Sequence, residues 1–142
     1  MSPVISNTSP LTNLAVIGHL GLVRTQLTRV VVPLAVWEEM LALPHPDART
    51  ALLSSQTEGW LQVATLANLA MAASLRLAGL DHGESEAISL AVETSASLLL
   101  MDEKKGRLAA RRLGVPVSGA LAIVAAARRA DKFYRPGPRL RD

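Results

Sequence analysis

No cysteine occurs in the 142 residues of this chain, which excludes disulfides, thiolate metal sites and cysteine nucleophiles. Aromatic residues make up only 3% of the chain, so the core must be built from Leu, Ala, Val and Ile. No uninterrupted apolar run reaches the ~20 residues that a transmembrane helix requires, and the start MSPVISNTSPL lacks the basic segment of a secretory signal. We therefore expect a soluble, cytoplasmic protein that does not enter a membrane.

Positive charge is also scarce in the first part of the chain. Residues 1–103 carry four basic residues against ten acidic ones, a net charge of −6, whereas residues 104–142 carry eleven against two, a net charge of +9. This imbalance predicts a polyanionic partner, because Lys and Arg release condensed counterions when they bind phosphates. The alternative is a solvated basic face with a basic tail. With so few aromatic residues, any nucleic acid would be contacted mainly through its backbone.

The order of segments predicts a single α/β domain. Short apolar, β-branched runs alternate with helical segments, a pattern typical of a central parallel sheet covered by helices. We expect this domain to span residues 1–132, and a mostly apolar helix to cover residues 66–78. Residues 133–142 (FYRPGPRLRD) contain too much Pro, Gly and Arg to pack, so they are predicted to form a basic, mobile tail.

Four polar residues stand at the ends of these predicted elements. Asn7 and Asp102 end two buried strands, Glu39 lies on the helix after another strand, and Glu84 opens a helix. Side chains at the carboxyl ends of neighbouring parallel strands converge on one crevice, where ligands and metals bind. Three carboxylates and one amide offer only oxygen ligands, which suit Mg²⁺ or Mn²⁺ better than zinc or copper.

Each of these residues also has an ordinary structural explanation. Glu84 has the spacing of a capping box with Asp81, and Asp102 stands where the N-cap of the next helix belongs. Glu39 lies early in a helix, where negative charge is favourable beside the positive end of the dipole. Asn7 could bond the backbone of its own turn, as Asn often does before a helix. The sequence leaves both explanations open for each residue.

The chain resembles the PIN (PilT N-terminal) domain superfamily along nearly its whole length. The resemblance lies in VISNTSPLTNLAVIGHLGLV, VVVPLAVWEEML, LDHGESEAISLA, SLLLMDEKKGRLAARRLGVPVSG and a final Ala-rich helix. The run SNTSPL is similar to the N-terminal signature of a prokaryotic PIN-like branch. The resemblance implies a three-layer α/β/α sandwich with a central, mostly parallel sheet. It further implies a metal-dependent ribonuclease of the toxin–antitoxin type that forms a homodimer and has a cognate antitoxin protein as partner.

The family's four acidic catalytic and metal-binding positions fall on the same four residues, listed here in chain order: Asn7, Glu39, Glu84 and Asp102. Glu38 competes with Glu39, Glu86 competes less well with Glu84, and Glu103 could contribute to a second, weaker metal. Active members usually carry Asp at the first position, and the amide of Asn7 contributes no formal charge. The resemblance therefore also allows a catalytically impaired PIN-like module that binds RNA or a protein partner.

Substrate-binding residues follow from the same resemblance. Thr8 and Ser9 match a hydroxyl-bearing loop that helps to orient the site. A run of basic residues directly after Asp102 is expected to hold RNA phosphates. The residues are Lys104, Lys105, Arg107 and Arg111.

Overall fold

A five-stranded, all-parallel sheet forms the centre of the fold in the computed structural model, which describes residues 2–133. The strand order is β3-β2-β1-β4-β5. The strands are β1 (Val4–Ser6), β2 (Val30–Pro33), β3 (Leu61–Ala64), β4 (Leu98–Leu100) and β5 (Val117–Ser118). The order runs outward from β1 on one side and from β4 on the other, so the chain reverses its direction of winding between these two strands. The predicted parallel sheet is confirmed, and β1 and β4 are neighbours in it.

Strands β2 and β4 are apolar along their whole length, as expected where helices cover both faces of a sheet. Ile5 pairs with Leu99 in β4 and with Val31 in β2, which places it at the centre of the sheet. Ile5, Leu99 and Leu100 are fully buried, as are Val30 and the other inward residues of β2. The hydrophobic core therefore lies along β2, β1 and β4, and it fixes the positions of the segments that leave these strands.

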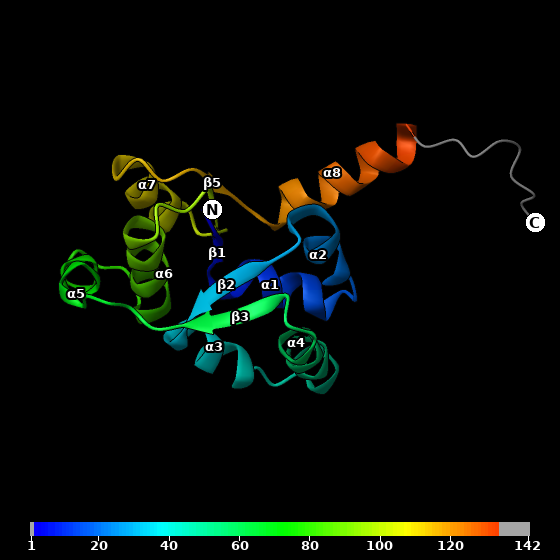
Figure 1. Cartoon of the computed structure of the whole chain (residues 1–142), viewed down its shortest axis with the longest axis horizontal. Helices are drawn as coiled ribbons and strands as arrows, with labels where there is room; N and C mark the ends of the chain where they lie inside the picture. The colour runs from blue at the N-terminus through cyan, green and yellow to red at the C-terminus, as the bar shows by residue number, and fades with distance from the viewer. Residues whose placement is uncertain (1, 134–142) are drawn as a thin grey trace, which may run out of the picture.

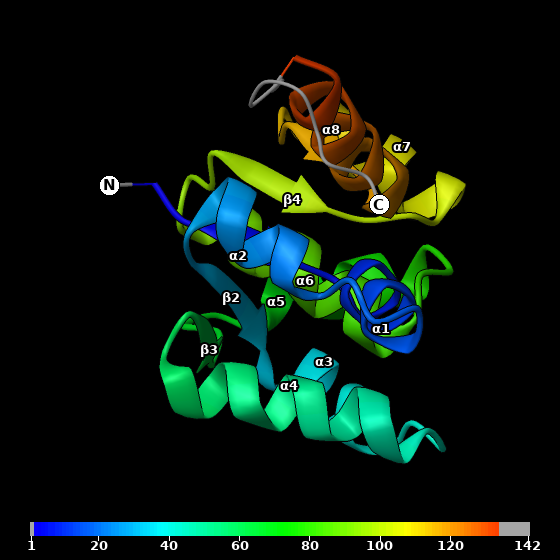
Figure 2. The ribbon, with the colours of Figure 1, turned by 90° about the vertical axis from the view of Figure 1, so that its right-hand side faces the viewer.

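Helices form the two outer layers. They are α1 (Thr8–Val16), α2 (Gly21–Leu27), α3 (Leu34–Leu41), α4 (Pro46–Glu58), α5 (Ala70–Leu77), α6 (His82–Glu93), α7 (Lys104–Arg112) and α8 (Ala120–Phe133). Figure 1 shows α5, α6 and α7 on one side of the sheet and α1, α2 and α4 on the other. The turned view of Figure 2 faces the layer of α1, α2 and α4. This is the three-layer α/β/α sandwich expected from the sequence.

Two predicted boundaries differ from the structure. The helix expected over residues 66–78 is confined to Ala70–Leu77, because Asn68 Oδ1 accepts a hydrogen bond from the Ala70 N–H at 2.8 Å and turns the chain just before it. At the other end α8 continues through Phe133, one residue into the predicted tail. The rest of that tail, 134–142, lies outside the described residues. Within residues 2–133, no helix combines the length and apolar character needed to cross a bilayer.

Several helices begin at the carboxyl edge of the sheet. α1 begins directly after β1, and α3 begins directly after β2. Because α6 runs back toward the start of β4, its first turn also lies at this edge, and α7 starts a few residues after β4 ends. Short connections thus bring four distant parts of the chain to one place.

Candidate active site

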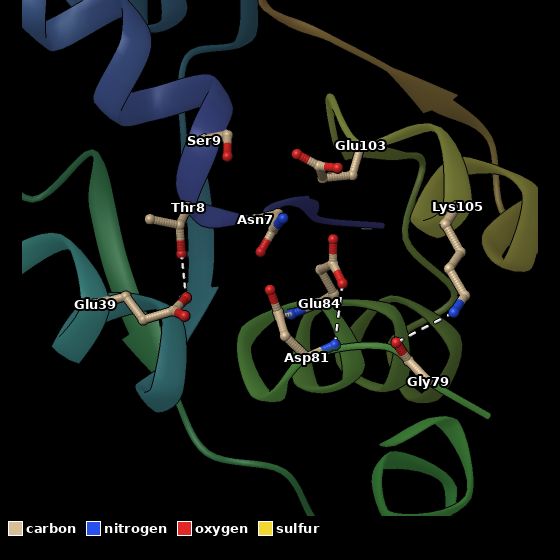
Figure 3. A pocket seen from close by; sticks show the side chains of 9 residues that line it. All are labelled: Asn7, Thr8, Ser9, Glu39, Gly79, Asp81, Glu84, Glu103 and Lys105. Atoms are coloured by element: carbon tan, nitrogen blue, oxygen red, sulfur yellow. Dashed lines mark hydrogen bonds between the residues drawn. The ribbon is translucent and has the colours of Figure 1, made fainter. Parts of the chain in front are cut away.

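A cavity of about 520 Å³ opens at the carboxyl edge of the sheet (Figure 3). Its walls come from the start of α1, from α3, from the turn and first residues of α6, and from the start of α7. The lining residues are Asn7, Thr8, Ser9, Glu39, Gly79, Asp81, Glu84, Glu103 and Lys105. Among the residues that the structure describes, four carboxylates therefore face one amine, which gives this lining a net negative charge. The predicted residues Asn7, Glu39 and Glu84 meet here, together with Thr8 and Ser9.

Asn7 brings an unsatisfied oxygen to this cavity. Its N–H donates to Leu100 O at 2.9 Å, which continues the pairing of β1 with β4 by one residue. The residue is only 3% exposed, and its Oδ1 has no hydrogen-bond partner among the described residues. Figure 3 shows the amide pointing toward Asp81 and Glu84. Because a buried acceptor without a partner costs about 1–3 kcal/mol, this oxygen is suited to a ligand that the cavity receives.

Glu84 is held by the capping box that its spacing indicated. The Asp81 N–H donates to Glu84 Oε1 at 3.0 Å, and the Glu84 N–H donates to Asp81 Oδ1 at 2.8 Å. Burial raises the pKa of Glu84 above its ordinary value. The hydrogen bond from Asp81 acts in the opposite direction, and the negative charges of Asp81, Glu103 and Glu39 raise the pKa further. A cation in the cavity would offset both the burial and the repulsion.

Glu39 reaches the cavity from α3 because two neighbours make room for it and hold it. Thr8 Oγ1 donates a hydrogen bond to Glu39 Oε1 at 2.5 Å. On the other side lies Gly83, where an added Cβ would stand 3.0 Å from Glu39 Cδ and closer still to Oε1. Glu38, the competing residue in the sequence, does not line the cavity. Glu86 is also directed elsewhere, and accepts hydrogen bonds from the Ala35 N–H and from His82.

The structure does not bring Asp102 into the cavity lining, contrary to the convergence expected from the sequence. Its Oδ1 accepts a hydrogen bond from the Ala120 N–H at 2.8 Å, and its Oδ2 accepts one from Asn13 Nδ2 at 3.3 Å. It is also not the N-cap of α7, since Glu103 occupies that position. Asp102 therefore satisfies the first N–H of α8. Gly119 permits this approach, because a Cβ there would lie 2.5 Å from Oδ1.

The contact of Asp102 with α8 leads to a stability prediction. Asp102→Ala is expected to lower the free energy of unfolding by about 1 kcal/mol, the typical cost of losing a helix cap. Asp102→Asn keeps an acceptor oxygen for Ala120 and should cost roughly half of that or less. Urea denaturation of both variants measures the difference. Equal losses of stability in the two variants would contradict the assigned contact. A lower Mn²⁺ affinity of Asp102→Asn at unchanged stability would show that Asp102 is a metal ligand after all.

Among the four predicted phosphate-binding residues, Lys105 alone lines the cavity. Its Nζ donates to Gly79 O at 3.3 Å. Lys104 and Arg111 are exposed along α7, and Arg107 lies near Gly119 and Asp102. The basic helix thus starts at the cavity and leads away from it.

Sequence reasoning missed the two glycines that shape the cavity. Gly79 and Gly83 carry no chemistry of their own, and nothing in the local sequence indicates which distant side chains they face. The sequence indicates Asp81 only as a capping residue. Its position three residues before Glu84 is also a signal that its carboxylate lies beside that of Glu84 in the cavity.

The donor set fits a hard divalent cation. It consists of carboxylate oxygens and the unpartnered amide oxygen of Asn7, which are ligands suited to Mg²⁺ or Mn²⁺. Within the described part of the chain, no three acidic or histidine side chains stand close enough to share one ion. Mg²⁺ does not require that, because it is commonly bound by one or two carboxylates and completes its shell with water and substrate phosphate oxygens.

Comparisons with known proteins agree with this architecture. The sequence profile of a family described as PIN domain matches residues 3–136. No curated protein matches the chain. Among solved structures, the chain is similar to a PilT N-terminus domain protein from the hyperthermophilic archaeon Sulfolobus solfataricus P2, with a TM-score of 0.62. The two share 16% identity over 96% of this chain and 98% of that chain, a likeness that establishes the fold alone.

Proposed function

The chain belongs to the PIN domain family, whose members are generally nucleases, and from this premise we propose that it is a Mg²⁺- or Mn²⁺-dependent ribonuclease. The reaction is hydrolysis of RNA phosphodiester bonds. The observation that carries the proposal is the buried, unpartnered Oδ1 of Asn7, which faces a cavity lined by four carboxylates. An oxygen-lined, acidic cavity that attracts a cation and lies beside a basic helix suits a polyanionic substrate.

Asn7, Glu39 and Glu84 are the residues that would hold the cation, with Asp81 beside them. When bound, Mg²⁺ or Mn²⁺ supplies a Lewis acid for the phosphodiester and for the attacking water. The protein's own contribution is orientation. Thr8 fixes the carboxylate of Glu39 and the capping box fixes that of Glu84, so both reach the cavity from rigid helices.

A matched pair of variants on α3 tests the proposal. Labelled single-stranded and structured RNAs are incubated with the protein and Mn²⁺ or Mg²⁺, with EDTA as a control. Glu39→Gln is expected to reduce cleavage by about 10²-fold or more, since it removes a charge from the cavity. Glu38→Gln makes the same chemical change one residue away and outside the lining, and should retain wild-type activity.

Two results would contradict the proposal. Cleavage that persists in EDTA would exclude the metal-dependent mechanism. Intact RNA in every reaction with folded wild-type protein would favour the alternative, a catalytically impaired module that binds RNA or a protein partner.

We further propose that the protein acts as the toxin of a toxin–antitoxin pair and forms a homodimer. The support for the toxin is the resemblance of SNTSPL to the prokaryotic branch, and growth arrest by the wild type but not by Glu39→Gln would test it. The support for the dimer is the exposed apolar surface at the two ends of α5, where Leu77 is 91% exposed and the N-cap residue Leu69 is 65% exposed. The molecular mass of the protein in solution tests the dimer: twice the mass of one chain is expected.

A further inference from the structure

We infer that the ammonium group of Lys105 contacts the phosphate that is cleaved, whereas the other basic residues of α7 hold only flanking phosphates. This inference rests on the proposed ribonuclease function. It assigns one of the basic residues of α7 to the reacting phosphate, on the basis of where each side chain lies.

The first observation is electrostatic. The cavity is lined by Glu39, Asp81, Glu84 and Glu103, so an RNA phosphate that enters it meets repulsion from several carboxylates. Among the described residues, Lys105 is the one basic residue in the lining. A lysine ammonium is a compact point charge and a common phosphate ligand in proteins.

The second observation is that the charge of Lys105 is not consumed by an ion pair. No carboxylate of the described residues lies within 4.0 Å of its Nζ, although four carboxylates line the same cavity. The ammonium group is held instead by the neutral carbonyl oxygen of Gly79, at 3.3 Å (Figure 3). Its positive charge therefore remains available to an incoming anion.

The third observation is that the glycine in the turn before α6 leaves room for this amine. Gly79 has a φ of +103°, a conformation that side chains disfavour, and a Cβ there would stand 2.5 Å from Lys105 Nζ. Lys105 also lies in the first turn of α7, where a positive charge is unfavourable beside the helix dipole. A role in substrate binding accounts for a lysine at this position.

The remaining basic residues are placed differently. Arg111 lies in the last turn of α7, where a positive charge complements the helix dipole. Arg107 lies beside Gly119, at the start of α8. Lys104 precedes Lys105 by one residue but does not line the cavity, which makes it the matched control.

Steady-state cleavage of labelled single-stranded RNA by the full chain with Mn²⁺ tests the inference. Lys105→Met is expected to lower kcat by about 10²-fold, the effect typical of losing one group that stabilises transition-state charge. Lys104→Met should raise KM while kcat stays within about threefold, and should reduce the slope of log affinity against log salt by about 0.7. Lys105→Arg keeps the charge and should restore part of kcat. Mn²⁺ affinity should not fall in any of the three variants, and their melting temperatures should match that of the wild type.

Three results would contradict the assignment of Lys105 to the cleaved phosphate. Equal kinetic effects of Lys105→Met and Lys104→Met, in a wild type that cleaves RNA, would overturn this inference alone. A lower melting temperature in Lys105→Met without rescue by Lys105→Arg would also overturn it and assign Lys105 a structural role. A folded wild type that cleaves no RNA would overturn the proposed function and this inference with it.

Discussion

Replacing Gly83 with alanine is expected to reduce RNA cleavage by about 10²-fold while the protein remains folded, because misplacement of a reacting group by about 1 Å can cost that much. The added methyl group would occupy the space that the Glu39 carboxylate now uses. Since this carboxylate is the end of a flexible side chain, it can swing away without disturbing the backbone. Alanine also favours helix more than glycine by about 1 kcal/mol, so thermal stability should be unchanged or higher.

A second substitution separates this explanation from a general defect. Glu39→Asp shortens the side chain by one methylene, so the double variant Gly83→Ala/Glu39→Asp should recover part of the activity lost in Gly83→Ala. Gly21→Ala is the matched control, because a Cβ at this helical glycine meets nothing within 4 Å. Wild-type cleavage by Gly83→Ala would refute the argument, as would a double variant less active than both single variants.

The broad arrangement of the site could be predicted because it follows from backbone topology. Asn7 follows β1 and Glu103 lies shortly after the neighbouring strand β4, and both line the cavity because parallel strands place their carboxyl ends together. The choice between Glu38 and Glu39 depends on which side of the helix faces the sheet edge, and in the structure Glu39 lines the cavity and contacts Thr8. The capping box of Glu84 was predicted from spacing alone and is present.

The details that were missed depend on contacts between residues distant in the sequence. Asp102 follows β4 as expected, but its carboxylate meets Asn13, 89 residues away, and the start of α8. No local pattern indicates that a helix N-terminus will compete for this side chain. Gly83 likewise faces Glu39 only because α3 and α6 pack at the same edge of the sheet. Such approaches between helices are set by the core and cannot be derived from spacing.

Glu84→Gln is expected to reduce RNA cleavage by about 10²-fold or more and to weaken Mn²⁺ binding. Glutamine keeps the length of the side chain and an oxygen that can accept from the Asp81 N–H, but it removes the charge from the most buried carboxyl group of the cavity. Glu86→Gln is the matched control on the same helix, since Glu86 does not line the cavity. A Glu84→Gln protein that cleaves RNA and binds Mn²⁺ like the wild type would remove Glu84 from the site.

The same substitution should stabilise the metal-free protein. The pKa of Glu84 is raised above the value of 4.5 expected when the chain is unfolded, so the fold favours the protonated form. The stability that this preference contributes is fully present below the unfolded pKa and is lost as pH rises through the folded pKa. Glu84→Gln stays neutral, so its advantage over the wild type should be greatest at neutral pH and should shrink on acidification. Urea denaturation in EDTA between about pH 4 and pH 8 measures this difference, and a variant less stable than the wild type at neutral pH would contradict it. Burial of Glu84 would then lower stability in the absence of metal, and a bound cation would offset that loss.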